Sequence, residues 1–134
     1  MKGMALAVGL VTLLPLDGGA QPPPVPANDS GREAVMILRV VNTVQARMSR
    51  PAGTYKSLGQ VLASPMFKEQ FSTASGTDSA TATVGQCTLI LVASDDQKHY
   101  QAMVAPSDKC GVTMLTNETG LIYSGRALGC DKQP

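Results

Sequence analysis

The sequence of 134 residues contains no tryptophan, two phenylalanines and three tyrosines. Its 11 basic and 10 acidic residues nearly cancel, which leaves a formal net charge of +1. Proteins that bind nucleic acids use basic patches and aromatic rings on which bases stack. The composition therefore predicts no nucleic-acid partner and directs the functional interpretation towards proteins.

Side chains that carry catalysis are also scarce, since His99 is the only histidine. A Cys87–His99 pair would need an exposed thiol of lowered pKa, but Cys87 opens an apolar run. Ser94 with Asp95 or Asp96 lacks the strand-to-helix turn that exposes a nucleophilic serine. The three cysteines lack the close Cys-x-x-Cys spacing of structural zinc sites. We therefore expect no catalytic, cofactor-binding or metal-binding residue, a non-enzymatic protein, and a histidine at the surface near a strand end.

A long hydrophobic run is missing as well. Met4–Leu16 is apolar but is interrupted by Pro15, and it is shorter than the ~20 residues that cross a bilayer. Small residues follow it at positions 18–20. This pattern predicts a signal peptide over residues 1–20, with cleavage between Ala20 and Gln21. The mature chain is then expected to be periplasmic or secreted and to keep no membrane span.

The next segment, residues 21–29, contains Pro22, Pro23, Pro24 and Pro26. Closely spaced prolines favour an extended polyproline conformation. This segment is interpreted as a linker that precedes a single folded domain over residues 30–134.

The domain is expected to begin with a long amphipathic helix. Ser30 and Glu33 have the spacing of a capping box, and Pro51 and Gly53 mark the end of the helix. Apolar residues recur at steps of three and four, which places them on one helical face: Ala34, Ile37, Leu38, Val41, Val44 and Met48. Because this apolar face is broad, we expect a sheet to cover it.

Shorter elements follow. Leu58–Leu62 is predicted to form a short helix, and Ser64 with Pro65 resembles the cap and first residue of another. The apolar side chains after this cap, which include Phe67, are expected to join the core rather than to bind a partner. Residues 72–83 are rich in serine, threonine, alanine and glycine and are predicted to be a loop, with Asp78 as a solvated turn residue.

Four β-rich runs complete the chain: Cys87–Ala93, Tyr100–Ala105, Val112–Thr116 and Leu121–Ser124. Gly120 is expected to provide a left-handed conformation in the last turn. The predicted fold class is α+β, with one long N-terminal helix packed on a four-stranded antiparallel sheet and short helices between them. The first run is apolar on both faces, so it is expected to be a central strand or to be covered on both sides.

Five motifs carry a family resemblance through their order and spacing. They are AVMILRVVNTVQA at 34–46, GTY at 53–55, SLGQVL at 57–62, HYQAMVAP at 99–106 and LTNETGLI at 115–122. Together they resemble the globular half of bacterial type IV pilin-like proteins, in particular acidobacterial prepilin-like proteins. The resemblance implies a structural or protein-interaction role related to type IV pilus or type II secretion-like systems. Pilin or secretion-system components would be the partners, contacted through the exposed helix flank or the C-terminal loops.

The N-terminus departs from the pilin pattern. Gly3 could stand for the processing glycine of a prepilin, but Val8 occupies the position of the expected glutamate. Pro15 and the glycines and prolines after it interrupt the long helix on which filament assembly depends. A second interpretation is therefore a soluble periplasmic or secreted binding module of the same fold, with no role in a filament.

The three cysteines are Cys87, Cys110 and Cys130. Export to an oxidising compartment favours a disulfide, and the spacing leaves two pairings open. One is Cys110–Cys130, which brackets the last hairpin, and the other is Cys87–Cys110. Pilin-like domains often close their C-terminal region with a disulfide, so the resemblance implies Cys110–Cys130 and leaves Cys87 outside it.

Overall fold

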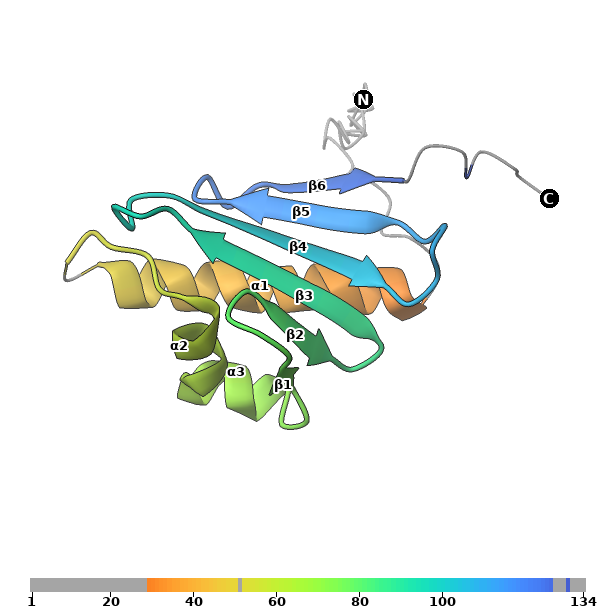
Figure 1. Ribbon diagram of the computed structural model, residues 1–134, viewed down its shortest axis with the longest axis horizontal. Coiled ribbons are helices and arrows are strands. Elements are labelled where there is room, and N and C mark those ends of the chain that lie inside the picture. The colour runs from red at the N-terminus through yellow and green to blue at the C-terminus, as the bar shows by residue number, and fades with distance from the viewer. Residues whose placement is uncertain (1–28, 51, 127–129, 131–134) are drawn as a thin grey trace, which may run out of the picture.

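The computed structural model describes residues 29–50, 52–126 and 130. In this part of the chain, one long helix packs along one face of a six-stranded antiparallel sheet (Figure 1). The predicted signal peptide, its cleavage site at Ala20–Gln21 and the linker up to residue 28 lie outside the described residues.

The three helices come first in the described chain, and the six strands follow them. The helices are α1 (Asp29–Ser49), α2 (Leu58–Ala63) and α3 (Pro65–Gln70). The strands are β1 (Ser75–Gly76), β2 (Thr81–Val84), β3 (Cys87–Ala93), β4 (Tyr100–Pro106), β5 (Thr113–Asn117) and β6 (Ile122–Gly125). Each strand pairs with the next, so the spatial order equals the chain order. This α+β meander confirms the predicted fold class.

The predicted sheet of four strands was wrong in number, because β1 and β2 occupy part of the region assigned to a loop. Residues 81–84 read Thr-Ala-Thr-Val, which alternates between the two faces, with Ala82 and Val84 buried and Thr83 exposed. Threonine fits the pleated surface of a strand, yet the surrounding small polar residues favoured a loop. Residues 81–84 form a strand because they pair with β3, in which Leu89 lies opposite Ala82.

The apolar face of α1 lies against the sheet as expected. Ala34, Ile37, Leu38 and Val41 are fully buried, and Val44 is nearly so. The predicted start at Ser30 was wrong by one residue, because α1 begins at Asp29.

The two short helices close the lower edge of the core (Figure 1). In α2, Ser57 and Gln60 form a capping box. In α3, the Ser64 hydroxyl accepts a hydrogen bond from the amide of Phe67, and Pro65 occupies the first turn. Phe67 is fully buried, so the prediction that this apolar cluster belongs to the core is confirmed.

The sheet has two different faces. Leu89 and Leu91 point towards α1 and are buried, whereas Val92 is 54% exposed on the opposite face. β3 is a central strand with partners on both sides. Figure 1 shows α1 behind the sheet, and no helix lies over the face of β3–β6 turned towards the viewer among the described residues.

Cys110 and Cys130 form a disulfide, with their Cα atoms 5.3 Å apart. The predicted pairing is therefore confirmed, and Cys87 lies outside it as a buried residue. The bond ties the segment between β4 and β5 to the chain that follows β6.

Candidate functional site

A groove of about 570 Å³ lies where the C-terminal half of α1 meets the start of β4 and the β5–β6 turn. We call it the loop-end groove. Its lining residues come from α1, from the segment after it, from the start of β4 and from the β5–β6 turn: Asn42, Thr43, Ala46, Arg47, Arg50, Tyr55, Tyr100, Glu118, Thr119 and Gly120.

Asn42 joins the helix to the sheet at the floor of the loop-end groove. Its Oδ1 accepts a hydrogen bond of 2.7 Å from the Tyr100 hydroxyl. Its Nδ2 donates to Thr116 Oγ1 at 3.0 Å and to the Gly120 carbonyl at 3.2 Å. Because a side-chain amide has one accepting and one donating end, these contacts hold the β5–β6 turn in a defined position on α1.

Tyr55 attaches the segment after α1 to the sheet beside the loop-end groove. Its ring centroid lies 4.8 Å from that of Tyr100, and its amide donates to the Gln97 carbonyl at 2.7 Å. Burial raises the pKa of the Tyr100 phenol well above its usual range. The phenol therefore stays protonated and serves as the donor to Asn42.

The β5–β6 turn has the form that the sequence predicted. Gly120 has φ of 76°, and its amide donates to the Asn117 carbonyl at 2.9 Å. The Asn117 side chain accepts hydrogen bonds from both the amide and the hydroxyl of Thr119. A residue with φ in the left-handed region favours glycine, which explains why Gly120 ends this turn.

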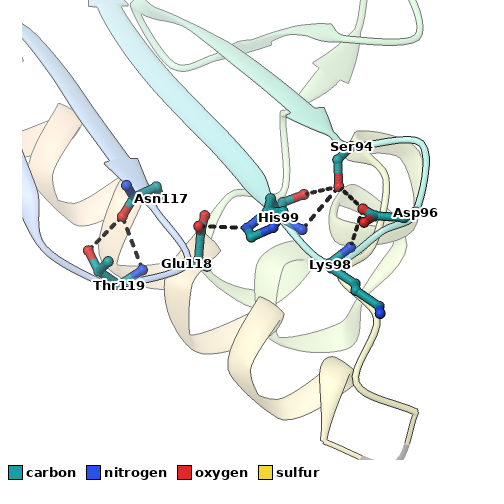
Figure 2. A network of polar contacts seen from close by, with 7 residues as sticks. All are labelled: Ser94, Asp96, Lys98, His99, Asn117, Glu118 and Thr119. Carbon is teal, nitrogen blue, oxygen red and sulfur yellow. Dashed lines mark hydrogen bonds and ion pairs between the residues drawn. The ribbon is translucent and has the colours of Figure 1, made fainter.

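His99 and Glu118 connect the two turns at the rim of the loop-end groove. His99 Nδ1 lies 2.9 Å from Glu118 Oε1, and the histidine side chain is 66% exposed. Figure 2 shows the imidazole directed at the Glu118 carboxylate. This hydrogen bond from His99 is the main cause that lowers the pKa of Glu118. An exposed pair of this kind contributes little to stability.

Ser94 and Asp96 cap the β3–β4 turn and do not form a triad with His99. The Ser94 hydroxyl donates to Asp96 Oδ1 at 2.5 Å and accepts from the backbone amide of His99 at 3.1 Å. The imidazole itself is directed at Glu118, as Figure 2 shows. A catalytic serine donates its hydroxyl proton to the nitrogen of a base, and here the Ser94 hydroxyl donates to the Asp96 carboxylate instead.

The other candidate site residues are either far from each other or already hydrogen-bonded within their own turn. Cys87 and His99 stand at opposite ends of the β3–β4 hairpin, and the six-residue rise along β3 alone corresponds to about 20 Å. Asp78 caps its own turn by accepting from the amides of Ala80 and Thr81. Within residues 29–50, 52–126 and 130, no cluster of three metal-ligating side chains occurs.

Cys87 instead packs at the far end of the sheet, beside the first turns of α1. Its Sγ donates to Glu33 Oε2 at 3.7 Å. Glu33 was expected to belong to a capping box at the start of α1, and the structure shows its carboxylate in contact with Cys87. Burial, together with the Glu33 carboxylate, raises the pKa of the thiol from 9.0 to about 11.

We expect Cys87 in the native protein to react with iodoacetamide at pH 8 at least about 100-fold more slowly than in the urea-unfolded chain. A pKa raised by two units lowers the thiolate fraction about 100-fold, and burial slows access further. Since the pKa is higher in the folded chain, folding stability is expected to fall as pH rises from 9 to 11. Timed alkylation followed by intact-mass analysis checks the rate, and a Cys87→Ala variant identifies the site. Equal rates in native and unfolded protein would contradict the buried thiol.

Two arginines give the loop-end groove its binding chemistry. Arg47 and Arg50 are exposed and line it from α1 and the residue after it. A guanidinium offers paired N–H groups that match a carboxylate. With Tyr55 and Glu118 on the other sides, the arrangement suits a peptide segment that carries an acidic side chain.

Sequence reasoning missed the two polar residues that organise α1. The sequence analysis assigned no role to Asn42 or to the fully buried Gln45. A signal for Gln45 was present, since it follows Val41 by four residues and so shares the apolar face. Its side chain accepts from the Lys56 amide and donates to the Lys56 carbonyl, each at 2.8 Å.

The chain shows no significant similarity to any protein-family model, curated protein or solved structure. In the described part of the chain, no helix has both the length and the apolar character needed to cross a membrane.

Proposed function

We propose that this chain is an exported, non-enzymatic, pilin-like domain with a structural or protein-interaction role related to type IV pilus or type II secretion-like systems. Its partners are pilin or secretion-system components, and the loop-end groove is the contact surface. The sequence motifs described above carry the pilin-like part of this proposal.

The observation that supports the interaction role is the convergence of the helix flank and the C-terminal turn on one groove. Asn42 donates a hydrogen bond to the Gly120 carbonyl, so the turn already lies against α1 in the free protein. A preorganised surface binds with a smaller entropic cost than a loop that must be ordered on binding. Arg47 and Arg50 then select a partner segment with carboxylates.

A photo-crosslinking amino acid placed at Ala46 in the native host tests this contact. We expect it to form an adduct with a pilus or secretion-system subunit, because Ala46 lines the groove. The same probe at Gln70, an exposed residue of α3, is the matched control. Reversing the charge of both Arg47 and Arg50 should abolish the adduct, and Arg39→Glu should not. Equal labelling at both positions, or none at Ala46, would contradict the proposal.

The alternative function is a soluble periplasmic or secreted binding module of the same fold. It is favoured by the interruptions at Pro15 and the glycines after it, which break the helix that a filament subunit requires. The intact mass of the protein from its native host separates the two functions. A mature chain that begins at Gln21 favours the module, and one that keeps Met4–Leu16 favours the filament subunit.

A further inference from the structure

None of the six strands contains a charged residue or a histidine. The outer face of the sheet, which points away from α1, is therefore uncharged. Its central row runs straight across four strands, because Ile90 pairs with Met103, Met103 with Leu115, and Leu115 with Tyr123. We call these four side chains the apolar row.

The apolar row is accessible along much of its length. Leu115 is 42% exposed and Tyr123 is 52% exposed, and Val92 beside the row is 54% exposed. The row and its neighbours line a depression of about 350 Å³. The outer face also carries polar but uncharged residues beside the row, among them Thr88, Gln101 and Asn117, as is usual for a solvated face of an antiparallel sheet. The unusual feature is the continuous apolar row between them, and an exposed apolar patch indicates a surface for contact with protein.

We propose that the outer face binds the same face of a second copy of this chain. Charge complementarity supports this occupant. An ordinary protein surface carries charged groups, and these would lose their hydration against the apolar row without gaining a partner. The outer face of a second copy is also uncharged, so this cost does not arise. Two sheets pack in this way about 10 Å apart, and a two-fold axis makes the contact self-complementary.

The available area sets the strength of this contact. The five strands β2–β6 contain four to seven residues each. At about 3.4 Å per residue and about 4.8 Å between strands, they present roughly 440 Å² per copy. The pair would bury about 900 Å², which is typical of weak, transient interfaces rather than of permanent ones. We therefore expect a reversible dimer with a Kd of about 10–100 µM. This inference rests on different residues from the loop-end groove and stands or falls separately from the proposed function.

Sedimentation of the full chain from about 1 µM to about 500 µM tests the proposal, since this range spans the expected Kd. The weight-average mass should rise towards twice that of the monomer. Leu115→Lys should weaken the dimer at least about tenfold, because the lysine charge would be buried without a partner. Leu121→Lys is the matched control, since Leu121 is 59% exposed but lies in the β5–β6 turn. Circular dichroism and the melting temperature confirm that each variant is folded.

A mixture of Leu115→Lys with Leu115→Glu should recover association that neither variant shows alone. A monomer at every concentration would overturn the proposal, and so would an unchanged dimer in Leu115→Lys. A monomer in which Leu115→Cys resists alkylation would also overturn it, because residues 1–28 of the same chain would then cover the face.

Discussion

Reduction of the Cys110–Cys130 disulfide is expected to lower the free energy of unfolding by about 3 kcal/mol. The bond closes a loop with a sequence separation of 20, and the chain-entropy model assigns about this value to a loop of that length. The main core contains neither cysteine. We therefore expect the reduced protein to keep its far-ultraviolet circular dichroism and to unfold at a lower urea concentration.

Urea titration with and without reductant measures this effect. The double variant Cys110→Ser with Cys130→Ser is the control, because reductant should not change its stability. The buried Cys87 remains in both proteins, so any effect of reductant on it appears in the control. Equal midpoints for the oxidised and reduced wild-type chain would contradict a stabilising disulfide.

Replacement of Gln45 by leucine is expected to cost about 2–3 kcal/mol, although leucine has a similar size and is more apolar. The Gln45 amide satisfies both the N–H and the C=O of Lys56 at 2.8 Å. Loss of one partner of a buried hydrogen bond costs about 1–3 kcal/mol for each group left unsatisfied, and because these two bonds are partly buried we expect a value near the lower end for each. Burial of the leucine side chain offsets part of this cost. The Lys56 segment also leads into α2, so its capping box is expected to loosen.

Gln70→Leu is the matched control for this variant, because Gln70 is an exposed residue of a helix. Its stability should remain within about 0.5 kcal/mol of the parent protein. Gln45→Glu provides a second comparison. The carboxylate can still accept from the Lys56 amide, but it places a second acceptor against the Lys56 carbonyl. Unfolding of Gln45→Leu at the same urea concentration as the parent would contradict this prediction. It would mean that water satisfies the N–H and the C=O of Lys56.

Much of the architecture follows from local patterns in the sequence. The spacing of Ile37, Leu38 and Val41 has the 3.6-residue period of a helix, and their complete burial confirms the face that it predicts. The boundaries of β3 coincide with the predicted Cys87–Ala93. The left-handed turn at Gly120 likewise depends on a few neighbouring residues. Each of these features is specified by residues that are close together in the sequence, so no contact with a distant segment is needed to predict it.

The candidate site depends instead on which segments meet. Asn42 and Thr116 are 74 residues apart, and only the packing of α1 on β5 brings their side chains within hydrogen-bond distance. A polar residue on a helix flank has the same local pattern whether it meets water or a buried hydroxyl. For this reason the sequence predicted turns and a helix but not the groove between them.

The sequence alone therefore determined the α+β class, the main helix and the four strands β3–β6, because hydrophobic periodicity is a local property. Tertiary structure decided that β2 joins the sheet, that Cys110 pairs with Cys130, and that Gln45 is buried. It also decided the register that aligns Ile90, Met103, Leu115 and Tyr123 into one row. Register and pairing arise from contacts between distant segments, and a single strand's alternation does not specify which residue lies opposite which.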